Sequence, residues 1–246
     1  MPNWTFNSLT VEGSKEDISA IKTQLNKPFQ RQHDTWNKDT GNMELVNVTY
    51  SNPVFAFWNI VKPTDLETYA LQKDPKHDDT IIDFKGDNWY DWNVRNWGTK
   101  WDVAVHDGEE YPETELLEED ETSLAYSFNT AWSPPLPAIE ALSAMFPNAE
   151  FDLEYEEETG WGGNYIFSNG QGTEIESYEN KCRDCGSLNT LEYCDNDCGE
   201  VCNECHYMGE ADLEAVAECQ DHKIYLTNEF IPNYRMDKVN DLTTTN

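Results

Sequence analysis

Basic residues are scarce in this chain and are missing altogether from its middle. It has 16 Lys and Arg against 48 Asp and Glu, a formal net charge of −32 at pH 7. Residues 101–180 contain 20 acidic residues and no Lys or Arg. We expect no direct binding to DNA or RNA, because neutralising phosphates requires a basic patch. The acidic surface would serve solubility, or it would mimic a nucleic acid and dock on a basic protein.

Long apolar runs are also lacking. No stretch approaches the roughly 18 apolar residues of a membrane-spanning helix, so no membrane span is expected. The N-terminal Met1–Trp4 has neither a basic stretch nor an apolar run, so we expect no secretory signal and a location in the cytoplasm of a host cell. The chain is nevertheless 38% hydrophobic and 13% aromatic, which is too apolar for a disordered acidic chain. We therefore expect it to fold.

Motifs of common enzyme classes are absent as well. The sequence contains no phosphate-binding loop, dinucleotide fingerprint, metalloprotease helix or nucleophile elbow. Gly160–Gly163 is followed by neither Lys nor a helix and indicates a turn. His33, His77 and His106 stand alone in polar contexts, which is typical of surface residues. These absences favour a binding function over catalysis.

Alternating strand and helix patterns predict an α+β fold with an antiparallel sheet and helices on one face. Ser14 with Asp17 resembles a helix N-cap, and the helix that follows would end near Pro28. Residues 29–50 are polar and are predicted to be irregular, and the acidic block 107–121 is predicted to form a loop. A helix to about Trp97 would be followed by a Gly turn and then a strand. The remaining strands are expected at 4–11, 123–129, 151–156 and 164–168, and a second long helix at 135–146.

Three segments resemble a known family. These are Pro2-Asn3-Trp4 with Asn7, Leu9 and Val11, the run Asn96–Asp102, and the run Phe128–Pro135. Together they are similar to the Api92-like (YubB-type) proteins of phages and plasmids over residues 1–170. The resemblance implies a ferredoxin-like domain and an origin in a mobile element. It implies no catalytic residues, and it does not extend to the cysteine-rich segment.

All seven cysteines lie between residues 182 and 219. An odd, tightly clustered set without a secretory signal argues against a disulfide framework. The pairs Cys182-x2-Cys185 and Cys202-x2-Cys205 have the spacing of a zinc ribbon, in which four thiolates hold one tetrahedral ion. Four protein ligands leave no open position, so such a zinc would be structural. Free or redox-active thiols are the alternative.

A second zinc is also compatible with the spacing. Cys194, Cys198, Cys219 and His222 would hold it if the pairs interleave as in a cross-brace finger. Lys181 and Arg183 flank the first pair and would offset its negative charge. The expected organisation is an Api92-like domain at 1–178, a zinc module at 179–225, and a final strand and polar tail at 226–246.

The leading hypothesis is a phage- or plasmid-encoded interaction protein that engages a basic host protein, for example to inhibit a host defence system. Its acidic face would be the block of seven glutamates Glu109, Glu110, Glu113, Glu115, Glu118, Glu119 and Glu121. The alternative is a nucleotide- or small-ligand-binding protein, or an enzyme, that uses an aromatic groove. The groove residues would be Trp92, Arg95, Trp97, Lys100 and Trp101. No catalytic residue is predicted.

Overall fold

Contacts divide the chain into two units, Met1–Ser177 and Tyr178–Asn246. The computed structural model describes residues 3–71, 84–108, 113–182, 185–189, 191–193 and 200–202. Within these ranges no helix is long and apolar enough to cross a membrane.

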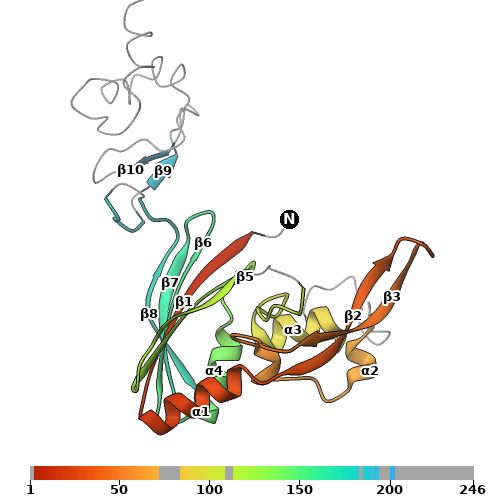
Figure 1. Ribbon diagram of the computed structural model, residues 1–246. Helices are drawn as coiled ribbons and strands as arrows, with labels where there is room; N and C mark the ends of the chain where they lie inside the picture. Colours follow the sequence, from red (N-terminus) through yellow and green to blue (C-terminus); the bar gives the residue numbers. More distant parts are fainter. Residues whose placement is uncertain are drawn as a thin grey trace, which may run out of the picture. The chain divides into compact units, whose positions relative to one another are not determined.

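The first unit is built on a six-stranded sheet in the order β4-β5-β1-β6-β7-β8 (Figure 1). The strand pairs from β4 to β7 are all antiparallel. The bounds are β1 Trp4–Glu12, β4 Thr114–Glu119, β5 Ser123–Ala131, β6 Glu150–Glu157, β7 Gly162–Ser168 and β8 Gln171–Tyr178. The predicted α+β fold with an antiparallel sheet is therefore confirmed.

Two helices cover one face of this sheet. Alternate residues of β1, β5 and β6 are buried, which places Leu9, Tyr126 and Leu153 on the covered face. Helix α1 (Lys15–Leu25) contributes Ile21 to this core, and helix α4 (Leu136–Met145) contributes Leu142. The opposite face carries the intervening, more exposed residues and is called the open face below.

The helix starts follow the predicted local signals. The Ser14 side chain accepts a hydrogen bond from the backbone N–H of Asp17, as an N-cap does. Helix α4 begins after Pro135 and carries a further proline in its first turn, where a missing N–H costs nothing. Helix α3 (Trp89–Trp97) starts on the side chain of Asn88 and ends at Gly98 with φ of 84°.

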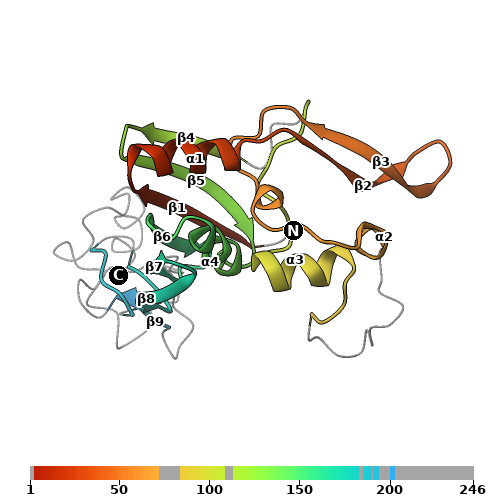
Figure 2. The ribbon, with the colours of Figure 1, turned by 90° about the horizontal axis from the view of Figure 1, so that it is seen from below.

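Residues 29–50, predicted to be irregular, form a long hairpin of β2 (Phe29–Asn37) and β3 (Asn42–Tyr50). Figures 1 and 2 both show it extending away from the six-stranded sheet. That prediction was wrong because most of the hairpin is polar on both faces, so the apolar alternation that marks a strand is missing. Between this hairpin and α3 lie a short 3-10 turn η1 (Phe57–Asn59) and helix α2 (Leu66–Tyr69).

Two further expectations need correction. The acidic block is not one loop, because Thr114–Glu119 form strand β4 at the edge of the sheet. Strand β4 lies at the edge of the sheet, and its charged side chains remain in contact with solvent, so their charge does not prevent the strand from forming. The strand predicted directly after Gly98 is not formed. Instead, the Asp102 carboxylate accepts hydrogen bonds from the backbone N–H groups of Phe57 and Ala104, and the chain turns there. Strand β8 was not predicted, since its residues are nearly all exposed.

The described part of the second unit is small. Strands β9 (Leu191–Tyr193) and β10 (Glu200–Cys202) form an antiparallel pair, and an isolated bridge joins Lys181 to Leu188. The predicted final strand and tail at 226–246 lie outside the described residues.

Candidate functional site

Three cysteines of the second unit lie together. The sulfur atoms of Cys182, Cys185 and Cys202 are all within 4.8 Å of one another. Cys182 and Cys202 are buried, and Cys185 is exposed. The Cys185–Cys202 sulfur separation of 3.7 Å is far beyond the roughly 2.05 Å of a disulfide bond. This group of thiols could hold a metal ion.

A tight turn brings the thiols of Cys182 and Cys185 close together. The Gly186 N–H donates to the Cys182 carbonyl at 2.9 Å, and the Cys182 N–H donates to Ser187. Gly186 adopts φ of 73°, a conformation that costs glycine nothing. The β9–β10 pairing then places Cys202 opposite Leu191. Of the predicted ligands, Cys205, Cys194, Cys198, Cys219 and His222 lie outside the described residues.

The predicted acidic face is divided by the fold. Glu109 and Glu110 lie outside the described residues, and Glu113 precedes β4. Glu119 and Glu121 pair with Lys22 and Lys15 of helix α1, each at 2.5 Å. Only Glu115 and Glu118 lie on the open face, opposite Ser127 and Ala125 of β5.

Other carboxylates join these two on the open face. The strand register places Glu12 of β1 opposite Glu150 of β6, whereas β5 separates the carboxylates of β4 from those of β1 and β6 on the same face. The full set is Glu12, Glu115, Glu118, Glu150, Asp152, Glu154 and Glu156. None of the six strands contains a Lys or Arg. Phe6, on the same face, is 50% exposed. We call these seven carboxylates and Phe6 the acidic sheet face.

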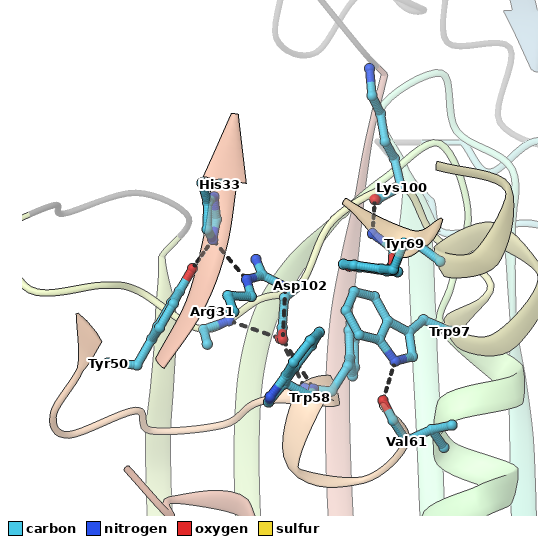
Figure 3. Close-up of polar contacts among 12 residues, drawn as sticks. Arg31, His33, Tyr50, Trp58, Val61, Tyr69, Trp97, Lys100 and Asp102 are labelled. Carbon is cyan, nitrogen blue, oxygen red and sulfur yellow. Dashed lines mark hydrogen bonds and ion pairs between the residues drawn. The ribbon is translucent and has the colours of Figure 1, made fainter. Parts of the chain in front are cut away.

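Most of the Trp-rich run does not form a groove. Trp92 and Trp97 belong to the hydrophobic core, and the Trp97 indole N–H donates to the Val61 carbonyl (Figure 3). The Arg95 guanidinium bonds the Phe84 and Gly86 carbonyls and pairs with Asp87. Trp92 and Trp97 are therefore core residues, and Arg95 is engaged by two carbonyls and Asp87, so these contacts give no support to a groove at the three positions.

Lys100 and Trp101 do reach the surface, and they meet an aromatic cluster. The Lys100 ammonium lies 4.5 Å from the ring centroid of Trp101, 4.9 Å from that of Trp132 and 5.9 Å from that of Tyr90. These are cation–π distances. Partial burial lowers the pKa of Lys100. Trp132 was not predicted as a site residue, because only the tertiary fold brings the end of β5 beside the loop after α3.

A buried ion pair lies beneath the hairpin. Arg31 of β2 approaches the fully buried Asp102 carboxylate, with Nη1 3.7 Å from Oδ2 (Figure 3). Asp102 also accepts the backbone N–H groups of Phe57 and Trp58 at 2.8 and 3.0 Å. Burial alone would lower the pKa of Arg31, but the Asp102 carboxylate and Tyr50 outweigh it and the pKa is raised. Asp102 thus ties the hairpin to the turn η1.

His33 and His106 are not isolated, contrary to expectation. The Nε2 atom of His33 accepts from the Arg31 Nε–H at 2.7 Å and lies 2.9 Å from the Tyr50 hydroxyl. Its ring centroid is 6.2 Å from that of His106. Burial, and then the Arg31 and His106 charges, lower the pKa of His33 to about 3. His33 is therefore a neutral acceptor in this network.

Residues 100–195 match the family model described as the ferredoxin-like domain in Api92-like protein. This part of the chain is similar to the Api92-like domain. A solved structure, protein api92 from Yersinia pseudotuberculosis, is similar over 74% of this chain and 99% of its own, at 12% identity and a TM-score of 0.45. No curated protein matches the chain.

The Api92-like match covers β4 to β9 and includes Cys182 and Cys185. It omits β1, the β2–β3 hairpin, helix α3 and Cys202. The matched range thus contains six of the seven open-face carboxylates of the acidic sheet face, all but Glu12, and two of the three cysteines of the three-thiol group.

Proposed function

We propose that this protein is a phage- or plasmid-encoded interaction protein that acts in the host cytoplasm, where its acidic sheet face binds a basic host protein. Inhibition of a defence system is the role we favour for this binding. The observation that carries the proposal is the charge of the open face. Seven carboxylates share one side of a sheet whose six strands contain no cation.

An acidic sheet face is suited to rapid capture of a basic partner. Like charges held side by side repel one another, so this arrangement costs the free protein stability. A basic partner relieves the repulsion and is steered onto the face over about 10 Å at 0.1 M salt. The half-exposed Phe6 supplies an apolar contact among the carboxylates. The negative potential of this face disfavours a nucleic acid as the partner, because phosphates would be repelled.

We further propose that the metal of the second unit is a structural zinc held by Cys182, Cys185 and Cys202, with Cys205 as the fourth ligand. Thiolates on one tetrahedral zinc, with bonds of about 2.3 Å, stand roughly 3.8 Å apart. The Cys185–Cys202 sulfur separation is 3.7 Å. A zinc with four protein ligands supplies folding energy and leaves no position for substrate.

Amide substitution of exposed open-face carboxylates tests the docking proposal. The face variant replaces Glu12, Glu115, Glu118 and Glu154 by Gln, all four of which are exposed on the open face. The control variant replaces Glu16, Asp39, Glu67 and Glu140 by amides and loses the same charge from exposed positions elsewhere. The probe is a purified lysine- and arginine-rich peptide, and binding is measured by calorimetry at low and high salt.

We expect the face variant to bind the peptide roughly tenfold more weakly than the wild type at low salt, and the difference to shrink at high salt. The control variant should bind within about twofold of the wild type. Equal losses in both variants would show that only net charge matters and would overturn the docking proposal. A host protein recovered from lysate would count as the partner only if the face variant, and not the control, fails to capture it.

A further inference from the structure

Lys100 holds an unusual position in a protein with so many acids. Its ammonium faces three aromatic rings, and among the residues that the structure describes no carboxylate pairs with it. Lys15, Lys22 and Arg95 all have such a partner. Figure 3 shows the Lys100 side chain extending away from the buried Arg31–Asp102 pair. Its charge is therefore available to an anion from solution.

One of the rings around Lys100, that of Trp132, is held at the surface by a strained backbone. Trp132 has φ of 76°, a left-handed conformation that is unfavourable for a bulky residue. Its N–H bonds the Asn3 carbonyl at 2.9 Å, and the next residue, Ser133, bonds Gly98. Despite this fixed backbone, 39% of Trp132 and 38% of Trp101 remain exposed. Strain that is maintained to expose a large ring points to a role for the ring.

Two more aromatic side chains extend the cluster. Trp4 lies 6.1 Å from Trp101, and Tyr90 lies 5.9 Å from Trp132, between ring centroids. The lysine stands between the two halves. Because an exposed cation–π contact is weak, a planar ring that stacks on the indoles can displace the ammonium, which then turns toward an anionic group on the same molecule.

We propose that Tyr90, Lys100, Trp101 and Trp132, with Trp4 beside them, form a binding site for a mononucleotide. The base stacks on the Trp101 and Trp132 rings, and the phosphate pairs with the Lys100 ammonium. This site shares no residue with the acidic sheet face. The mononucleotide proposal therefore goes beyond the docking function and is tested independently of it.

A free mononucleotide fits the electrostatics better than a nucleic-acid strand. A mononucleotide brings one phosphate group to the one lysine, whereas a strand brings several phosphates to a protein of net charge −32. Neighbouring phosphates of a strand would gain no cation from residues 101–180, which contain no Lys or Arg.

Calorimetric titration of the full chain with AMP, adenosine, inorganic phosphate and a short single-stranded oligonucleotide tests the proposal. The variants are Lys100→Gln, Trp101→Leu and Trp132→Gly, and Lys62→Gln is the exposed-lysine control. Trp132→Gly is informative because glycine tolerates the left-handed backbone at that position. Thermal unfolding of each variant monitors the fold.

We expect AMP to bind more tightly than adenosine, and phosphate alone to bind least. Lys100→Gln should weaken AMP about fivefold and leave adenosine unchanged. Trp101→Leu and Trp132→Gly should weaken both ligands about tenfold. Lys62→Gln should match the wild type. Absence of AMP binding at about 1 mM, equal affinities in all variants, or tighter binding of the oligonucleotide than of AMP would each overturn the proposal.

Discussion

At the residue scale, one histidine shows how burial fixes a protonation state. His33 accepts a hydrogen bond from Arg31, and a guanidinium can only donate. The acceptor nitrogen therefore carries no proton, and a protonated His33 would lose this bond and face a buried positive charge. The pKa near 3 expresses that conflict.

This conflict predicts a pH dependence of stability. Unfolded His33 would titrate near 6.5, so between about pH 6.5 and pH 3 the unfolded chain binds a proton that the native protein does not. The contribution of His33 is present above pH 6.5 and is lost as the pH falls. We expect His33→Gln, whose amide oxygen still accepts from Arg31, to lose less stability than the wild type between about pH 7 and pH 4.

The measurement is urea denaturation at a series of pH values in that range. The titrations of the many carboxylates are common to both proteins, so the difference between wild type and variant isolates His33. Two curves that stay parallel across the range would show that His33 binds its proton equally well in the folded and the unfolded protein, and so that its pKa is not lowered by folding.

At the element scale, the end of helix α3 decides where the aromatic cluster forms. Gly98 ends the helix with φ of 84°, and a Cβ atom there would lie 2.6 Å from the Pro137 ring and 3.0 Å from the Pro134 carbonyl. This turn sends Lys100 and Trp101 toward the end of β5. A side chain at Gly98 would force the helix and the proline-rich loop apart.

Gly98→Ala is therefore expected to destabilise the protein by at least ~2 kcal/mol, from a left-handed backbone and an overpacked contact together. Gly41→Ala provides the control. Gly41 also has a positive φ, of 66°, but its Cβ would meet nothing within 4 Å. It should cost only about 1 kcal/mol, the backbone term alone. Urea unfolding gives both values, and equal costs would show that the contact with the prolines relaxes freely.

At the scale of the whole molecule, the two units depend on different sources of stability. The first has a large apolar core that includes Leu9, Ile21 and Trp97. In the second, the described core is little more than the buried Cys182 and Cys202. Small modules with little apolar burial are commonly held by a metal, whose binding free energy is then folding free energy.

Loss of the proposed zinc should therefore unfold the second unit and spare the first. We expect purified protein to carry at least one zinc ion per chain by elemental analysis, and Cys182→Ser to release it. Amide exchange should then rise in the described residues after Tyr178, while the sheet residues of β1 and β5 keep their protection. Ser187→Ala, which leaves all three thiols in place, is the control and should retain the metal.

Two results would contradict this picture. If protein prepared without chelator contained no metal, the proposed zinc site would be wrong. A Cys182→Ser variant that loses protection in β1 would show that both units unfold as one cooperative body.

The sequence by itself determined the elements whose signals are local. The start of helix α1 could be predicted because its N-cap, Ser14, and its apolar stripe are both recognisable in residues close together in the sequence. Strands β1, β5 and β6 were predicted from alternation because one of their faces is buried. The spacing of Cys182 and Cys185 likewise follows the local geometry of a thiol knuckle.

Only the tertiary structure decided what depends on residues far apart in the chain. Strand β8 is nearly all exposed, and the half-buried positions of β2 include the polar residues Arg31 and His33, so neither strand shows the apolar alternation that predicts a strand. Burial removed Trp92 and Trp97 from the predicted groove, and the fold brought Trp132 to Lys100. The acidic sheet face arose in the same way, because strand register, and not position along the chain, decides which carboxylates share one face of the sheet.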